Sequence, residues 1–491
     1  GNFRLKDWVA NKKLLSLAGV MEKYDKYLAE NGLYDFDDMI DEAVKALHDD
    51  AGFRMSLQER YQYILLDEFQ DTSRVQWDNF RPLLKNSIDS GFYNLIVGDV
   101  KQSIYRFRNS DWKLLRDEAP NGFGKNVLHD TLEDNWRSYG NIIRFNNSFF
   151  STIAGVLDKK LGFEQKDGKI EDGVMTGIYE DVEQNIKKDH DGAVRLTFCS
   201  PEDELQAILD SINAALAKGY KYRDIAVLVR WNKDGSEVAS YLIANKIGVV
   251  TDDSLIISSS LTVRRLVSLL SSIDNPDDSM AKYLAEHLEV DIPESYSSII
   301  DLCEDLLRKL RDYNEDVFNS EVLYVQSFMD VLRDYVEKNG NSLHSFLKDW
   351  EGNTQSISSP KAGDSVRIMT VHKSKGLDFP YVIIPFAETM SLYKADPYWC
   401  SPDLEGTDLE ASAEGVYDVN LSSSAENTCF SDYYIQERFL QQVDNINTLY
   451  VAMTRASLGN HIIAVTPPAS QMESFSKMIL TEFKDMSQIL Y

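Results

Sequence analysis

The sequence predicts an α/β protein of more than one domain, in which strands of a mostly parallel sheet alternate with helices. Short apolar runs that end in acidic or glycine residues, with helical apolar spacing between them, carry this prediction. The length of 491 residues supports it, because a single hydrophobic core does not grow that large. Later in the chain a long and almost purely helical block interrupts the alternation.

The first part of the chain contains two candidate strands of such a sheet. Helices are expected before them, over 14–28 and 40–47. The apolar run Tyr63–Leu66 then ends at Asp67 and Glu68, and the run Asn94–Val97 ends at a Gly-Asp pair. Ligands of a doubly wound sheet bind beyond the carboxyl ends of its strands, so these strand ends are candidate site positions.

A second α/β pattern follows the segment 161–191, which is rich in Gly, Asp, Glu and Lys and which we interpret as a connection or flap. We expect strands over 194–198, 225–229, 366–370, 381–385 and 461–465, and helices over 202–217, 235–245 and 445–455. The block 261–350 is helical apart from a break at Asn275–Asp278, and the linker 352–363 follows it. The helical block is therefore predicted to be an insertion between two halves of the second α/β domain.

Composition limits the classes of function. A net charge of −28 argues against a general polyanion binder, although it leaves room for a local basic groove. No run of about 18 apolar residues is present, so no membrane span is expected. Cys199, Cys303, Cys400 and Cys429 lack the spacing of a metal site or a redox motif, and we interpret them as reduced, buried cysteines of a cytoplasmic protein.

The pair Asp67 and Glu68 is the first candidate for chemistry. At the end of a strand, one carboxylate can hold Mg²⁺ while its neighbour polarises the water that attacks a γ-phosphate. The alternative is structural, because an acidic residue after a strand often caps the next helix.

The segment Gly98–Arg108 combines a polar side chain with paired rings. Gln102 lies just past the second strand, where a side-chain amide can contact a γ-phosphate. Tyr105 and Phe107 then alternate with two arginines, and this pattern is typical of rings that stack on bases beside guanidinium groups that bind phosphates or stack themselves. The alternative is an amphipathic edge with buried rings.

These two segments resemble motifs II and III of the superfamily 1 DNA helicases related to UvrD, Rep and RecB. Four further stretches are similar to other motifs of that family and stand in the same order: Tyr34–Met39 before motif II, Leu132–Ser138 (motif IV), Val366–Pro385 (motif V) and Leu449–Ala456 (motif VI). The wording HKSKGLDFP within motif V favours the RecB and AddA branch. The resemblance implies two RecA-like P-loop NTPase lobes, the first of them incomplete, with an inserted all-helical subdomain.

The resemblance also implies a role for each matching residue at the nucleotide. For ATP hydrolysis it implies Asp67 on Mg²⁺, Glu68 as the general base, Gln102 at the γ-phosphate, and Arg137 and Arg455 as arginine fingers. For ATP binding it implies Trp136 stacked on adenine, Gly376 in the motif V loop, and Asp378 at the ribose, where the family more often has Glu.

For the track of single-stranded DNA, the resemblance implies the residues Tyr105, Phe107, Arg108, Thr370, His372 and Lys373. Outside this motif, His372 would be interpreted as a hydrogen-bonded loop histidine. Inside it, a role facing DNA is favoured.

One motif of the family is not in the sequence. A phosphate-binding loop has the pattern Gly-x-x-x-x-Gly-Lys-Ser/Thr, and its nearest imitation, Ala119–Asn126, has alanine at the first glycine position and asparagine in place of the hydroxyl. In the family this loop precedes motif II. We therefore expect that the natural chain extends further at its N-terminus and that this chain alone hydrolyses ATP poorly.

The predicted division of the chain has four parts: a partial first lobe over 1–144, the second lobe over 145–250 and 361–491, and the helical subdomain over 251–360. The favoured function is a 3′-to-5′ DNA helicase or translocase that acts on single-stranded DNA in recombination or repair with ATP and Mg²⁺. A second helicase or nuclease subunit is a candidate partner. A catalytically dead helicase-like module and an RNA helicase are the alternatives.

Overall fold

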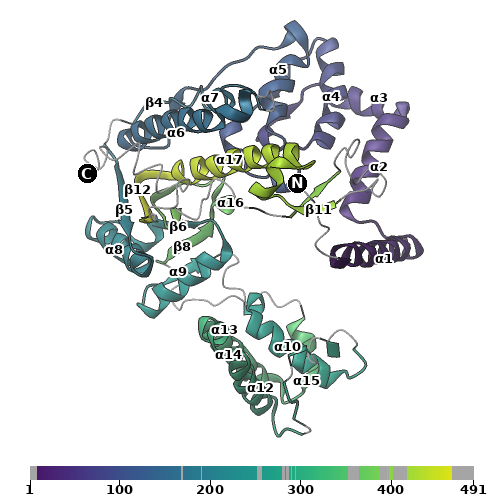
Figure 1. The fold of residues 1–491 in the computed structure, drawn as a ribbon, viewed down its shortest axis with the longest axis vertical. Helices are drawn as coiled ribbons and strands as arrows, with labels where there is room; N and C mark the ends of the chain where they lie inside the picture. Colours follow the sequence, from purple (N-terminus) through teal and green to yellow (C-terminus); the bar gives the residue numbers. More distant parts are fainter. Residues whose placement is uncertain are drawn as a thin grey trace. The chain divides into compact units, whose positions relative to one another are not determined.

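The computed structural model describes residues 8–166, 170–188, 191–251, 257–278, 282–283, 287–288, 290–293, 295–351, 364–387, 395, 397–401 and 417–466. Within these ranges the chain forms two compact units (Figure 1). Unit 1 comprises the residues up to 192 and those from 395 to 454, and unit 2 comprises 193–387 and 455–466.

Unit 2 is built on a six-stranded sheet in which every neighbouring pair is parallel, in the order β5-β12-β9-β6-β8-β7. The strands are β5 (Ala193–Cys199), β6 (Ile225–Val229), β7 (Val249–Thr251), β8 (Val366–Thr370), β9 (Phe379–Ile384) and β12 (Ala456–Val465). All five residues of β6 are buried, as expected for a central parallel strand with both faces covered. The helices α8 (Glu204–Ala217) and α9 (Asn232–Ala244) pack against β12 and β8 respectively.

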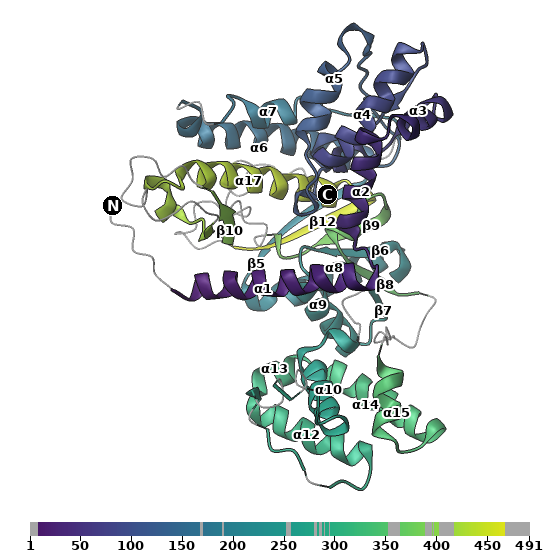
Figure 2. The same cartoon turned by 90° about the vertical axis from the view of Figure 1, so that its right-hand side faces the viewer.

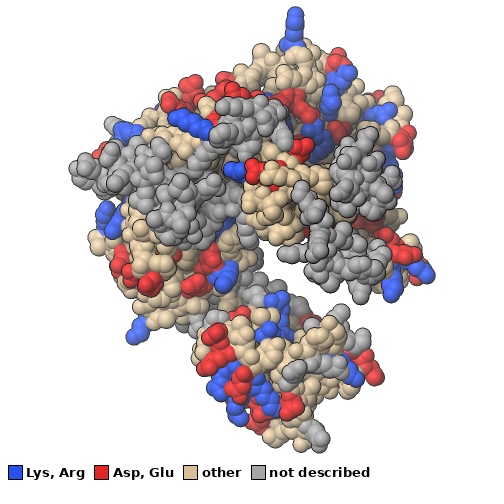
Figure 3. All heavy atoms as spheres, in the orientation of Figure 1, with Lys and Arg blue, Asp and Glu red and all other residues tan. Residues whose placement is uncertain are grey.

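A helical block lies between β7 and β8 in the chain. Its helices are α10 (Leu261–Asp274), α12 (Ile299–Tyr313), α13 (Glu315–Ser320), α14 (Val322–Asn339) and α15 (Leu343–Trp350). Phe328, Phe346 and Trp350 form a cluster of edge-on and stacked rings at its centre. On the face seen in Figure 3, acidic and basic side chains are interspersed over this block.

Unit 1 has many helices and little sheet. Its helices are α1 (Trp8–Asn31), α2 (Phe36–Asp49), α3 (Ala51–Arg60), α4 (Arg74–Asp89), α5 (Ala119–Asn121), α6 (Gly140–Lys166), α7 (Val174–Ile178) and α17 (Ser431–Met453). Its strand pairs are β1 (Leu65–Leu66) with β2 (Leu95–Ile96), β3 (Asp134–Asn135) with β4 (Asn185–Ile186), both parallel, and the antiparallel β10 (Pro397–Cys400) with β11 (Tyr417–Asn420).

The helices α6, α7 and α17 form one layer of unit 1, and α6 and α17 lie side by side in Figures 1 and 2. Three buried rings join them: Phe150 from α6 stacks on Tyr179 at 5.7 Å between centroids, and both contact Tyr450 of α17 edge-on. This aromatic packing holds α17 against α6 and the end of α7.

The predicted class, mixed α/β with a central parallel sheet, is confirmed. Several elements differ from their predictions; β1 and β2, for example, are shorter than the predicted runs 63–66 and 94–97. The segment predicted to be a flap contains the end of α6, all of α7 and β4. The last predicted helix begins at Ser431 and ends at Met453, so Arg455 lies beyond it. The four-part division into lobes stays a prediction, and α6 runs through the proposed boundary at 144/145.

No helix in the described ranges is both long enough and apolar enough to cross a membrane. All four cysteines are free thiols. Cys303 and Cys400 are buried as predicted, whereas the prediction is wrong for Cys199 and Cys429, which are half-buried.

Candidate nucleotide and DNA sites

The acidic pair Asp67 and Glu68 follows β1, and Gly98 and Asp99 follow β2. Because β1 and β2 are parallel, with Leu66 opposite Ile96, both strand ends lie at the same edge. Glu68 has a φ of 50°, in the left-handed region that non-glycine residues rarely occupy. Its backbone N–H donates to Asp67 Oδ1 at 2.9 Å.

Gln70 connects the two strand ends. Its side chain, only 1% exposed, donates from Nε2 to Glu68 Oε2 at 2.6 Å, and its Oε1 accepts from the Asp99 backbone N–H at 3.0 Å. Gly98 leaves the space for this side chain, since a Cβ there would lie 2.7 Å from Gln70 Oε1. The carboxylate of Glu68 is therefore held by a buried amide that is itself fixed to the next strand.

Gln102 is held through Asp99. It ends the short 3-10 turn Val100–Gln102, and its Nε2 donates to Asp99 Oδ2 at 2.9 Å. Glu68 and Gln102, predicted from separate motifs, are thus joined by an unbroken series of hydrogen bonds through Gln70 and Asp99.

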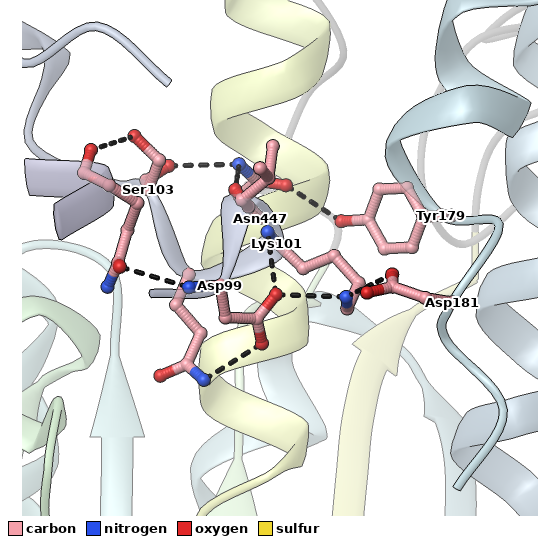
Figure 4. A network of polar contacts seen from close by, with 9 residues as sticks. Asp99, Lys101, Ser103, Tyr179, Asp181 and Asn447 are labelled. Atoms are coloured by element: carbon pink, nitrogen blue, oxygen red, sulfur yellow. Dashed lines mark hydrogen bonds and ion pairs between the residues drawn. The ribbon is translucent and has the colours of Figure 1, made fainter. Parts of the chain in front are cut away.

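Lys101 is buried in the same turn, at 5% exposure. Its Nζ lies 2.9 Å from Asp99 Oδ1 and 2.6 Å from Asp181 Oδ1 (Figure 4). Burial lowers the pKa of Lys101, but the attraction of the two carboxylates outweighs it and raises the pKa above its ordinary value. The lysine therefore stays charged and fixes the carboxylate that binds Gln102.

Asn447 of α17 holds the turn from the other side (Figure 4). Its fully buried Nδ2 donates to the carbonyl oxygens of Val100 and Ser103, both at 3.0 Å, and its Oδ1 accepts from the Tyr179 hydroxyl at 2.8 Å. Burial raises the pKa of Tyr179 well above its ordinary value, so this hydroxyl remains a donor.

The predicted DNA-facing residues of unit 1 form a compact group. The Tyr105 and Phe107 rings meet edge-on at 5.9 Å, and the Arg108 guanidinium carbon lies 5.4 and 5.6 Å from their centroids. Phe107 is 67% exposed. Asn109 ends this turn with a φ of 64°. The group places ring surface, which can stack on bases, next to a positive charge.

Trp136 and Arg137 follow β3. The Trp136 ring is 67% exposed, with the Lys187 ammonium 6.0 Å from its centroid. The Arg137 Nη1 donates to the carbonyl oxygen of Thr454 at 3.4 Å. Thr454 caps α17 and directly precedes Arg455 in the chain.

In unit 2, the predicted track residues lie at the carboxyl end of β8. Thr370 ends the strand, and the short helix α16 (Val371–Ser374) carries His372 and Lys373. Arg230 follows the neighbouring strand β6, and its Nη1 lies 3.2 Å from His372 Nε2.

Arg230 and its neighbour Trp231 were not among the residues predicted from the sequence. The Arg230 guanidinium carbon lies 4.9 Å from the centroid of the Trp231 ring, which is 51% exposed. A signal was present, because the apolar run of β6 is followed by an Arg-Trp pair just as β1 is followed by Asp-Glu. Together with Lys373, these residues make the edge of the sheet basic and aromatic.

Two of the remaining predicted residues, Gly376 and Asp378, lie in the loop before β9 in unit 2, and the third, Arg455, contacts this loop. Gly376 has a φ of 82°, which glycine adopts without strain, and Asp378 is exposed. Arg455 is buried, and its Nη1 donates to the Leu377 carbonyl oxygen at 3.1 Å. Pairing of β12 with β9 produces this contact, because the Phe379 N–H donates to the Arg455 carbonyl oxygen at 2.9 Å.

The described part of the chain contains no group of three or more His, Cys, Asp or Glu side chains that could hold a metal ion. The exposed carboxylate of Asp67 suits Mg²⁺, which keeps several waters and is often bound through one or two carboxylates together with phosphate oxygens.

Two family models match this chain. The UvrD/REP helicase N-terminal domain matches residues 4–121, and the UvrD-like helicase C-terminal domain matches residues 131–348 and 315–463. The chain belongs to the UvrD-like helicases. The order of the matches agrees with the order of the motifs, since β1 and β2 fall in the first match and β12 lies at the end of the second.

Relatives of this UvrD-like helicase chain include helicase/nuclease subunits and DNA helicases. An ATP-dependent helicase/nuclease subunit of Lactococcus lactis subsp. lactis is 29% identical over 52% of this chain and 22% of the relative. The subunit of the same name from Leuconostoc mesenteroides is 24% identical over 90% of this chain and 41% of the relative. The ATP-dependent DNA helicase Rep of Buchnera aphidicola is 29% identical over 54% of this chain and 37% of the relative. The chain thus spans well under two thirds of the relatives' length.

Proposed function

We propose that this chain is part of an ATP-dependent DNA helicase or translocase that moves 3′ to 5′ on single-stranded DNA in recombination or repair. The observation that carries the proposal is the hydrogen-bonded series from Glu68 through Gln70 and Asp99 to Gln102. It holds a carboxylate and an amide at neighbouring strand ends, where ligands of parallel sheets bind. The finer architecture, two RecA-like lobes with the helical block as an insertion, is part of this proposal.

In the proposed hydrolysis step, Glu68 takes a proton from the attacking water and Gln102 orients that water toward the γ-phosphate. Asp67 would hold Mg²⁺, which would supply positive charge beside the phosphate oxygens. Arg137 and Arg455 stabilise the charge that develops on the transferred group, because planar cations with several donors suit spread negative charge. Glu68 needs a fixed orientation for this step, and Gln70 provides it.

For nucleotide binding, we propose that Trp136 stacks on the adenine, which its exposed ring permits. Asp378 and the Gly376 turn would contact the ribose side of the nucleotide.

For DNA, we propose that Tyr105 and Phe107 stack on bases with Arg108 beside them. In unit 2, at the carboxyl ends of β6 and β8, we propose Thr370, His372 and Lys373 as DNA contacts, together with the missed pair Arg230 and Trp231. Local clusters of this kind bind single strands in spite of a net charge of −28, because stacking does not depend on the charge of the whole protein.

The sequence contains no phosphate-binding loop, so we propose that this chain alone hydrolyses ATP poorly. One surface is suited to a strand–loop–helix unit that would bring such a loop. On β1, β2 and the residues next to them, the large side chains of one face are 38–86% exposed: Tyr63, Leu65, Tyr93, Leu95 and Val97. Parallel strands are normally covered on both faces.

The names of the helicase/nuclease relatives, which call them subunits, suggest a heteromeric enzyme, so a second helicase or nuclease subunit is proposed as a partner. A catalytically dead helicase-like module is the second candidate, favoured by the missing phosphate loop. The gene sequence upstream of Gly1 separates the two: a phosphate loop there supports the motor, and a start codon at this point supports the dead module.

Binding of a fluorescent single-stranded DNA oligonucleotide tests the DNA part of the proposal. The variants Tyr105→Ala and Phe107→Ala should each weaken binding by about fivefold or more, the value of one base–ring stack. Tyr313→Ala is the matched control, because Tyr313 is an exposed ring beside Arg265, at 5.3 Å, in the helical block. Equal losses in all three variants, or none in the first two, would rule out this track. An RNA oligonucleotide of the same sequence decides between DNA and RNA.

A further inference from the structure

Arg106 stands between the two rings of the proposed track, yet its guanidinium is bound to two carboxylates of this chain. Its Nη1 and Nη2 donate to Glu437 Oε2 and Oε1 at 2.8 and 2.9 Å, and its Nε donates to Asp444 Oδ2 at 2.5 Å. The side chains of Arg106, Glu437 and Asp444 are 28%, 10% and 20% exposed. The contact is therefore a bidentate pair with a third bond, largely withdrawn from water.

The surroundings of Arg106 differ from those of Arg108, the other arginine of the alternating pattern. Two carboxylates surround one guanidinium, so the immediate group carries an excess of negative charge and would repel a DNA phosphate. Arg108, by contrast, is exposed and lies beside the rings of Tyr105 and Phe107.

Both carboxylates lie on α17, which contacts the same segment at a second point. One helical turn beyond Asp444, Asn447 donates to the carbonyl oxygens of Val100 and Ser103 (Figure 4). The helix thus holds the segment near Gln102 through Asn447 and near the rings through Arg106. Its last residues lead directly to Arg455.

We propose that Arg106 is a positioning residue for the single-strand track, which fixes the turn that presents Tyr105 and Phe107 by binding Glu437 and Asp444 on α17 and takes no DNA phosphate itself. This inference rests on the proposed function, since it needs the two rings to stack on bases. It makes α17 a common support for the DNA-facing rings and for the segment that carries Gln102.

The test is binding of a single-stranded DNA oligonucleotide that contains 2-aminopurine, measured over a series of salt concentrations. The variant Arg106→Lys keeps the charge but cannot form the bidentate fork. We expect about fivefold weaker binding, the loss of one base–ring stack, together with weaker stacking-induced quenching of 2-aminopurine. The slope of log affinity against log salt should stay unchanged, because no phosphate contact is lost. Asp444→Asn, made on α17 alone, should change binding and quenching in the same direction.

Arg116→Lys is the matched control. Arg116 also binds two carboxylates in unit 1, Asp117 at 2.6 Å and Glu171 at 2.7 Å, and its side chain is 22% exposed. Loss of that fork should leave oligonucleotide binding and quenching unchanged. If Arg116→Lys weakens binding as much as Arg106→Lys, the effect is general destabilisation of unit 1 and the proposal falls.

Two other results would overturn the proposal. Wild-type binding and quenching in both Arg106→Lys and Asp444→Asn would mean that the fork positions nothing. A salt slope lowered by about 0.7 in Arg106→Gln would mean that Arg106 contacts a phosphate of the single strand. If Tyr105→Ala and Phe107→Ala also bind like the wild type, the proposed track itself is wrong and the inference falls with it. A loss confined to those ring variants rejects the role of Arg106 alone.

Discussion

Gln70 is a single residue that fixes the position of Glu68 relative to the end of β2. Its buried amide donates to the carboxylate of Glu68 and accepts from the backbone N–H of Asp99. Its Oε1 would lie 2.7 Å from a Cβ on Gly98. A glycine and a glutamine that are 28 positions apart in the sequence, at 98 and 70, therefore depend on each other. No local sequence pattern predicts this mutual dependence, because it arises only when β1 and β2 pair.

Gly98→Ala should destabilise unit 1. The new methyl group would lie 2.7 Å from Gln70 Oε1 and 2.8 Å from a Leu115 methyl carbon, so the buried glutamine must move. We expect a loss of roughly 1–3 kcal/mol in the free energy of unfolding, as for overpacking elsewhere. The measurement is a thermal melt followed by circular dichroism. Gly155→Ala in α6 is the control, because a Cβ there has no neighbour within 4 Å, and it should be neutral or stabilising by about 0.5–1 kcal/mol. Equal melting temperatures for the two variants would contradict the packing described.

His461 gives unit 2 a specific response to pH. It is buried in β12 between the Thr197 hydroxyl, 2.8 Å from Nε2, and the Ser211 hydroxyl, 2.5 Å from Nδ1. Burial, with a smaller effect of Arg195, lowers the pKa of His461 from 6.5 to about 3. The unfolded chain therefore takes up a proton as the pH falls through 6.5, whereas the folded chain does not until about pH 3.

The free energy of unfolding should accordingly fall by roughly 1.4 kcal/mol per pH unit below the unfolded pKa on account of this group. His461→Gln lacks the titrating ring, so its urea midpoint should change less than that of the wild type between pH 7 and pH 4.5. Parallel pH profiles for the two proteins would show that His461 is not held neutral.

At the scale of elements, the existence and type of most helices and strands could be predicted, and their lengths less well. The predicted strands at 225–229 and 366–370 agree with β6 and β8. Short apolar runs of this kind are typical of buried parallel strands. β1 and β2 were predicted too long. Their apolar runs continue past the paired residues, and one face of those runs is exposed. The predicted flap was polar enough to suggest a loop, but α7 buries Val174, Met175 and Ile178.

Leu65 and Leu66 lie on opposite faces of β1, so substitutions of these two leucines compare the exposed face with the face that packs on the core. Leu65 is 72% exposed, whereas Leu66 packs against the core formed around Phe69 and Trp77. Leu66→Ser should lower the free energy of unfolding by more than about 1 kcal/mol, and Leu65→Ser should change it by less than about 0.5 kcal/mol. Urea denaturation followed by tryptophan fluorescence compares the two. A larger cost at Leu65 would show that the face described as exposed is covered in solution.

At the scale of the molecule, composition pointed away from nucleic acid, whereas the motifs pointed toward it. A charge of −28 describes the whole chain, whereas the proposed DNA binding depends on small groups such as Tyr105 with Phe107 and Arg108, or Arg230 with Trp231. The role of Arg106 could not be predicted, because its partners Glu437 and Asp444 lie more than 300 positions later in the chain. The comparisons confirm the helicase family, and the residue roles at the nucleotide stay predictions.

We propose that this chain binds single-stranded DNA, whereas its sequence contains no phosphate-binding loop. Steady-state ATP hydrolysis by this chain, with and without a single-stranded DNA oligonucleotide, tests both points when binding of the same oligonucleotide is measured beside it. We predict that the oligonucleotide binds and that ATP turnover stays at background in both conditions. Turnover stimulated by DNA would contradict this prediction, because it would require a phosphate site that the sequence does not contain. Absence of oligonucleotide binding would contradict the proposed track.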